Sequence, residues 1–419
     1  MAFGKHLITL GLAAALGVSP ALAAQDDADG SSGETVPQIS PIALDFDADG
    51  ISGPAADVLR EEIARSQFVM IGEDHGYADP PLLLSALGAE GSEHGFDYYA
   101  VEVGPISTAW LEDKLAAGGT EELAAVFAGR PLAAPFLSMR EEALAALPYA
   151  CAGKLWGVDQ EFIGSPLIHF EFLAERATGD VRAMVEGLLN EEREAFASGN
   201  QANVFIVKAQ PEDWQNLRDA FSDDELALAV IHELERSAKV YQSNFQGRGL
   251  DNNLDRVALI REYFLDAYTK AQAVDGKPPK VVMKFGATHG GRSTSPMATF
   301  DLGSIIEGMA AANGMEALHI VYMPLGGEQT AIRPSPDGWF LTKPTDGEKL
   351  RSLLGSAGVD LAAMEGSEGH FLIPMNPVKR ALRNKGLQEL DGMSRFFVLG
   401  FDYLVTTNAA KPATPLASE

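Results

Sequence analysis

The chain has 419 residues, of which 59 are Asp or Glu and 32 are Lys or Arg, so its formal net charge at pH 7 is −27. Such an acidic surface repels nucleic-acid phosphates and anionic lipid headgroups, which argues against both as partners. Cys151 is the only cysteine, so no disulfide can form within one chain and an apolar core must hold the fold together.

Residues 1–23 have the three regions of a secretory signal in the expected order. A short polar start precedes an apolar stretch from Leu7 to Val18, which is too short to cross a bilayer. Ala21 to Ala23 supplies the small residues of a cleavage site. We therefore expect an exported protein, periplasmic or extracellular, with no integral membrane segment in the mature chain.

Short apolar runs alternate with helical patterns along most of the chain. Five runs predict strands: Phe68–Ile71, Tyr98–Val101, Leu155–Val158, Lys280–Phe285 and His319–Tyr322. Helices are predicted between them, at Gly53–Arg65, Pro80–Leu87, Ser107–Leu115 and Ser138–Leu147. The runs are continuous, as in strands buried on both faces, and the alternation predicts an α/β fold with a mostly parallel open sheet flanked by helices.

The stretch from 170 to 269 interrupts this alternation with three charged helical patterns. It is predicted to be a helical insertion between the third and fourth strands, and such an insertion would form a lid or wall over the sheet edge. Later strands are predicted at Phe371–Ile373 and Phe396–Leu399.

The sequence thus predicts a single α/β domain over residues 41–407. The polar segment 24–40, rich in Asp, Gly and Ser, is predicted to be a disordered leader. Residues 408–419 are predicted to be a flexible tail.

Chemically capable residues follow four of the predicted strands. Glu73 and His75 follow the first, Glu102 ends the second, Asp159 follows the third, and His289 follows the fourth. Because the carboxyl ends of parallel strands meet at one edge of the sheet, where ligands bind, we expect these side chains to converge. Asp159 also has an ordinary alternative role as a helix cap.

Two of the charged residues lie on or directly after apolar runs. An unpaired carboxylate at Glu102 would be costly there, so the sequence predicts a partner such as His75 or a cation. Lys284 interrupts the fourth strand, and it either reaches toward the sheet edge or pairs with a buried acid.

These motifs resemble the erythromycin esterase-like and ChaN-like proteins, to which the TraB and TIKI proteins are related. The shared features are Ile71-Gly72-Glu73-Asp74-His75-Gly76, a second strand ending in Glu102, and a late strand followed by the loop that holds His289. Together they extend in order over roughly residues 68–322. Only Asp74 separates Glu73 from His75, a spacing nearer the ChaN-like pattern.

The resemblance implies an exported hydrolase whose water attacks an ester, lactone or amide carbonyl. His75 would be the general base, oriented by Glu73 and Glu102. His289, with Arg292 or Lys284, would polarise the carbonyl or stabilise the oxyanion. The helix that carries Arg256 loosely resembles an arginine-bearing helix of the esterases, which makes Arg256 a candidate binding residue beside Asp159.

Three alternatives remain open at this stage. The hydrolase is either metal-free or dependent on a divalent ion held by His75, His289, Glu73 and Glu102. A third alternative is a non-enzymatic protein of the ChaN-like type that binds haem or a metal. Each of these takes a small-molecule substrate or ligand.

Overall fold

The computed structural model describes residues 38–417, apart from residue 131, residues 336–337 and residues 384–385. The predicted signal and most of the predicted leader lie outside these residues, so export stays a prediction. The leader was expected to reach residue 40, but Ile39 is already buried and forms a parallel bridge with Val359.

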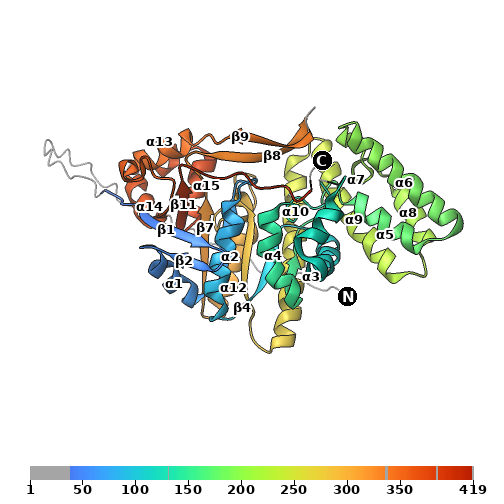
Figure 1. Ribbon diagram of the computed structural model, residues 1–419, viewed down its shortest axis with the longest axis horizontal. Coiled ribbons are helices and arrows are strands. Elements are labelled where there is room, and N and C mark those ends of the chain that lie inside the picture. Colours follow the sequence, from blue (N-terminus) through green and yellow to red (C-terminus); the bar gives the residue numbers. More distant parts are fainter. Residues whose placement is uncertain (1–37, 131, 336–337, 384–385, 418–419) are drawn as a thin grey trace, which may run out of the picture. The chain divides into compact units, whose positions relative to one another are not determined.

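A nine-stranded sheet in the order β2-β1-β10-β11-β7-β3-β6-β4-β5 forms the centre of the fold (Figure 1). Its strands are β1 (Ile42–Asp47), β2 (Gly50–Ser52), β3 (Ser66–Glu73), β4 (Phe96–Val101), β5 (Leu155–Gly157), β6 (Lys280–Gly286), β7 (Glu316–Tyr322), β10 (His370–Pro374) and β11 (Tyr403–Thr407). The section from β11 to β5 is parallel throughout, and β1, β2 and β10 are attached antiparallel at the other edge. The predicted mostly parallel sheet is confirmed.

Helices cover both faces of the sheet, and strand alternation decides which residues each face receives. Val69 and Ile71 of β3 pack toward α1 (Ala56–Arg65), α2 (Asp79–Ser92), α3 (Pro105–Phe127) and α4 (Arg140–Ala152). Phe68 and Met70, one residue out of phase, pack toward α10 (Gly249–Asp275) and α12 (Leu302–Ala312). Burial on both faces explains why the central strands are continuous apolar runs.

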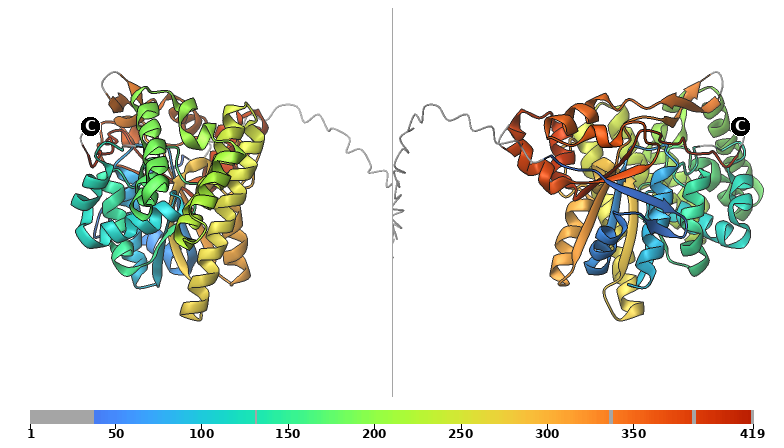
Figure 2. Two further views of the ribbon diagram at one scale, coloured as in Figure 1. Left: turned by 90° about the vertical axis from the view of Figure 1, so that its right-hand side faces the viewer. Right: turned by 60° about the vertical axis from the view of Figure 1, so that its left-hand side comes forward.

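The predicted helical insertion is present between β5 and β6. It consists of α5 (Pro166–Arg176), α6 (Gly179–Ala197), α7 (Phe205–Lys208), α8 (Pro211–Ala220) and α9 (Glu225–Phe245), and α10 then returns along the sheet (Figures 1 and 2). These helices share an apolar core of their own, which includes Phe170, Phe205 and Trp214. None of the helices in the described part of the chain is long and apolar enough to cross a bilayer.

A long hairpin crosses the carboxyl edge of the sheet toward the insertion (Figure 1). Its strands, β8 (Glu328–Ser335) and β9 (Gly338–Pro344), pair only with each other among the described strands. Trp339 packs against Phe196 of α6, with 6.0 Å between the ring centroids. The hairpin therefore links the sheet to the insertion.

The predicted strand at Phe396–Leu399 is wrong, because that segment lies in helix α15 (Gly392–Gly400). Asp391 caps this helix and accepts hydrogen bonds from the backbone N–H groups of Met393 and Ser394. A four-residue apolar run does not distinguish strand from buried helix, and here the cap decides. The last strand is β11, which follows the helix.

The predicted flexible tail is also corrected over residues 408–417, which we call the C-terminal strap. Ala410 and Ala413 are buried, and the strap forms bridges with Tyr77, Met139 and Gly327. Its Pro- and Ala-rich composition suggested disorder, but its backbone groups are paired with neighbouring loops, which fixes the segment.

Gly76 is the point where the strap, the hairpin and the loop after β3 meet. Its carbonyl accepts hydrogen bonds from the N–H groups of Thr330 and Ala413, both at 2.9 Å. Its φ is +95°, and a Cβ added there would lie 2.0 Å from the Thr330 carbonyl oxygen. Only glycine fits this position without moving the backbone.

We predict that Gly76→Ala destabilises the protein by about 2–4 kcal/mol, since it combines backbone strain with a backbone clash. Gly308→Ala in α12 is the matched control, because a Cβ there meets nothing within 4 Å. It should be stabilising by about 0.5–1 kcal/mol. Chemical denaturation of the two variants measures both effects, and an equal stability for them would contradict this account of the junction.

Candidate active site

The predicted convergence of side chains at one sheet edge is observed. Strands β3, β6 and β4 are parallel neighbours, so the residues that follow them emerge side by side. His75 and His289 both lie within ion-pair distance of Glu102, on opposite oxygens, and His75 also contacts Glu73. Side chains from separate strands therefore form one continuous cluster.

His75 is the accessible member of this cluster. Its side chain is 33% exposed, whereas those of Glu73 and Glu102 are buried. Its Nδ1 lies 2.9 Å from Oε1 of Glu73, its Nε2 lies 3.7 Å from Oε2 of Glu102, and its ring packs on Phe136 with 4.2 Å between centroids. Burial lowers the pKa of His75, but the charges of Glu102 and Glu73 outweigh it and leave the pKa raised above 6.5.

A buried lysine holds the carboxylate that orients His75. The Nζ of Lys284 lies 2.5 Å from Oε1 of Glu73 and 2.9 Å from Oε1 of Glu142. Burial raises the pKa of Glu73, but Lys284 and His75 lower it by more, so the net shift of this pKa is downward. For Glu142, burial outweighs Lys284 and raises the pKa to about 7. The ammonium of Lys284 thus keeps Glu73 ionised, whereas Glu142 is able to hold a proton near neutral pH.

Arg256 supplies the partner that Glu102 was expected to need. Its Nη2 donates to Glu102 at 2.8 Å and to Asp159 at 2.5 Å, and its Nε donates to Asp159 at 3.0 Å. The second Glu102 oxygen accepts the backbone N–H of Gly286 at 2.7 Å. Burial raises the pKa of Asp159, but Arg256 more than offsets this and lowers it. Asp159 therefore acts here as the counter-ion of Arg256.

His289 lies on the other side of Glu102. It follows β6 in the short helix α11 (Ala287–Gly290), and its Nδ1 lies 2.7 Å from Oδ2 of Asp301. Its Nε2 lies 3.9 Å from Oε1 of Glu102. The two histidines thus flank one carboxylate, and each is held at Nδ1 by a second carboxylate.

The structure does not bring Arg292 to this cluster. Its two terminal nitrogens each lie 2.6 Å from the carboxylate of Asp402, which precedes β11, and its Nε lies 3.3 Å from Glu307. The chain turns back after Gly291, which packs against Phe396 of α15, and the turn carries Arg292 away from the His75 edge. The expected role of Arg292 in the site is therefore wrong.

Three residues of the site were missed by sequence reasoning. Glu142 was treated only as part of a helix, although a carboxylate on the buried face of α4 needs a partner. Asp301 caps α12 and at the same time holds His289. Phe136 lies in a connection with no periodic pattern, so no sequence signal identified it.

A cavity of about 450 Å³ opens above His75. It is bounded by the α3–α4 connection, the start of the insertion and the β8–β9 hairpin, and its lining residues are His75, Leu132, Pro135, Phe136, Phe162, Ile163, Gln201, Gln329, Thr330, Ala331, Ile332, Trp339 and Lys343. Its volume lies in the range of small-molecule sites, and most of its wall is apolar.

The predicted metal ligands do not fit a divalent ion. Among the residues that the structure describes, no three His, Cys, Asp or Glu side chains are grouped so that they could hold one. One oxygen of Glu73 lies against Lys284 and one oxygen of Glu102 against Arg256, so internal cations already neutralise these two carboxylates. We therefore derive no chemistry through a metal.

Comparison with known proteins identifies the fold. No protein-family model matches the sequence, and no curated protein matches it. A histidine-to-asparagine variant of the erythromycin esterase EreC, in its open conformation, matches at 14% identity and a TM-score of 0.54, covering 85% of this chain and 94% of that one. A succinoglycan biosynthesis protein matches at 15% identity and a TM-score of 0.52, covering 89% and 95%.

ChaN of Campylobacter jejuni, in a structure of its cofacial haem binding, matches at 11% identity and a TM-score of 0.27, covering 68% of this chain and 93% of that one. A likeness that weak carries no argument about haem. The two stronger matches confirm, at the level of fold, the resemblance to erythromycin esterase-like proteins that the sequence motifs suggested. They do not transfer an activity.

The raised pKa of Glu142 makes stability depend on pH. Its stabilising contribution is complete below about pH 4.5 and is lost as the pH rises through about 7. We predict that the free energy of unfolding falls between pH 5 and pH 8, and that Glu142→Gln reduces this fall by on the order of 1–3 kcal/mol. Urea unfolding of the wild type and Glu142→Gln at four pH values measures how the free energy of unfolding changes with pH.

Glu141→Gln is the control for this prediction, because the neighbouring carboxylate is not buried and, among the described residues, accepts only the N–H of Thr414. Its pH dependence should follow that of the wild type. If Glu142→Gln and Glu141→Gln show the same slope, Glu142 does not hold a proton in the folded state.

Proposed function

We propose that this protein is a hydrolase in which His75 activates a water to attack an ester, lactone or amide carbonyl. The observation that carries the proposal is the setting of His75. It is a partly exposed titratable group on the lining of a mostly apolar cavity, and the acids and bases behind it are buried and paired. Such a group, poised between acid and base forms in a cavity, is typical of an active site.

The contacts of His75 support a role as a base in this proposal. In the neutral ring, Nδ1 carries the proton and donates it to Glu73, which leaves the lone pair on Nε2 to accept a proton from water. The hydroxide equivalent adds to the carbonyl carbon as Nε2 takes the proton. Glu73 and Glu102 stabilise the imidazolium, which then returns its proton to the departing oxygen or nitrogen.

His289 was expected to stabilise the oxyanion, but its side chain is only 4% exposed and is not among the residues that line the cavity. Its Nδ1 is held by Asp301, and its Nε2 has no hydrogen bond among the described residues. In this proposal it stands behind Glu102 and does not reach the substrate. Lys284 does not reach the substrate in this proposal, because it is fully buried between Glu73 and Glu142, and it acts by positioning Glu73.

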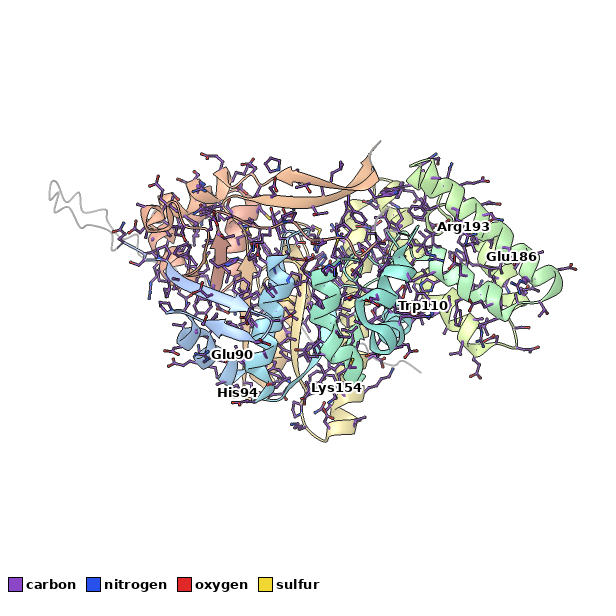
Figure 3. All side chains as sticks on the ribbon, viewed as in Figure 1. Glu90, His94, Trp110, Lys154, Glu186 and Arg193 are labelled. Carbon is purple, nitrogen blue, oxygen red and sulfur yellow. The ribbon has the colours of Figure 1, made fainter. Side chains whose placement is uncertain are left out.

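We predict that His75→Asn lowers kcat for hydrolysis of activated esters by about 10²–10⁴-fold, the usual contribution of a general base. His94→Asn is the control, since His94 is exposed and lies at the amino end of β4, at the end of the sheet away from the hairpin (Figure 3). Steady-state kinetics on a panel of esters and lactones would test this. Equal activity in His75→Asn and His94→Asn would refute the role of His75.

The proposal also fixes the direction of the pH dependence. Only the neutral form of His75 can accept a proton, and the pKa of His75 is raised above 6.5. We therefore predict that kcat/KM increases with pH through an apparent pKa above 6.5. Stopped assays in buffers from pH 5 to pH 9 measure the profile, and a limb centred well below 6.5 would contradict the assignment.

A further inference from the structure

Building on the proposed function, we infer that the site accepts an amphiphilic substrate with an apolar body and a negatively charged group, which Lys343 binds. His75 and the residues that orient it do not determine which class of substrate the cavity accepts. Three observations carry the inference: the apolar wall of the cavity, the absence of carboxylates among the described residues of that wall, and the position of Lys343.

The cavity wall provides a surface for an apolar body. Phe136, Phe162 and Trp339 present aromatic rings, and Leu132, Pro135, Ile163, Ala331 and Ile332 complete the apolar lining. Phe136 packs both on His75 and, at 6.2 Å between centroids, on Phe162. An apolar chain or ring placed along these side chains would therefore bring its carbonyl to His75.

The charges on the cavity lining are all basic. Of the described residues that line it, only His75 and Lys343 are ionisable, and neither is acidic. The chain as a whole carries 59 acidic and 32 basic residues, so a ligand cavity with cations and no carboxylate departs from the general surface. An anionic ligand would pass an acidic surface and gain attraction only within this cavity.

The side chain of Lys343 has no partner that would use its charge. It is exposed, and its ammonium forms no ion pair or hydrogen bond with any other described residue. Some lysines elsewhere, such as Lys208 and Lys239, pair with a neighbouring acid. A lysine left unpaired beside an apolar wall is available to a ligand, and its attraction there is stronger than in open water.

The hairpin register places Lys343 close to the proposed base. Lys343 stands directly opposite Gln329 in the antiparallel ladder, so both side chains lie on the same face and both line the cavity. Gln329 in turn donates from Nε2 to the carbonyl oxygen of His75 at 2.6 Å. Lys343 is therefore the direct cross-strand neighbour of Gln329, which is hydrogen-bonded to His75.

Asp74 is an exposed acidic residue that contacts the cavity lining through Gln329. Its Oδ2 accepts a hydrogen bond from Gln329 at 3.1 Å, but its exposed side chain does not line the cavity. Gln329 thus separates Asp74 from the ligand space. This arrangement leaves Lys343 to determine the sign of the ligand charge that the cavity favours.

The experiment compares esters of one length and one leaving group. The probes are p-nitrophenyl decanoate, the mono-p-nitrophenyl ester of decanedioic acid, and an analogue ending in trimethylammonium. We expect kcat/KM for the anionic ester to exceed that for the neutral ester at least tenfold. Lys343→Gln should reduce this ratio at least fivefold, and Lys343→Glu should shift the preference to the cationic ester. Lys349→Gln, an exposed lysine of α13 (Glu348–Ser356), is the control and should leave the ratio unchanged.

A binding measurement separates this inference from the proposed function. Isothermal titration of His75→Asn with decanoate and with decyltrimethylammonium should show tighter binding of the anion by at least fivefold, and Lys343→Gln should remove the difference. Anion preference without hydrolysis of any ester would sink the proposed function and keep the inference. Hydrolysis with no preference among the three esters, or a preference unchanged in Lys343→Glu, would overturn the inference alone.

Discussion

The buried ammonium of Lys284 is the interaction on which the site depends. It lies on a central strand, fully buried, between Glu73 and Glu142. A charge in such a place is tolerated only because two carboxylates neutralise and hydrogen-bond it. The ion pair fixes Glu73, Glu73 fixes the Nδ1 side of His75, and the ring is thereby oriented from inside the protein.

The second half of the cluster repeats this design with a different cation. Arg256 enters from α10, the helix that returns along the sheet, and neutralises Glu102 and Asp159. The two carboxylates that flank His75 are therefore held by cations from different layers, Lys284 from the sheet and Arg256 from α10. Correct docking of α10 on the sheet is thus a requirement for the geometry of the site.

Sequence reasoning succeeded where a residue is positioned by one strand. Parallel strand ends converge by topology, so Glu73, His75, Glu102 and His289 could be grouped, and the cost of an unpaired buried charge correctly required a partner for Glu102. For Lys284 the sequence left two alternatives open, and the structure shows the pairing with buried acids. Sequence reasoning failed for Arg292, because three residues after His289 the chain has already turned back, and a motif carries no information about that turn.

The segments that cover the carboxyl edge of the sheet near His75 could not be predicted for a related reason. The hairpin and the C-terminal strap have no strong periodicity, and they are fixed by backbone pairing with distant loops, as at Gly76. Yet the hairpin supplies Gln329, Trp339 and Lys343 to the cavity. The residues that would break a bond are therefore encoded at strand ends, which sequence patterns reveal. Those that would choose the substrate lie on segments whose positions only the folded chain determines, so two proteins with this sheet can share chemistry and differ in substrate.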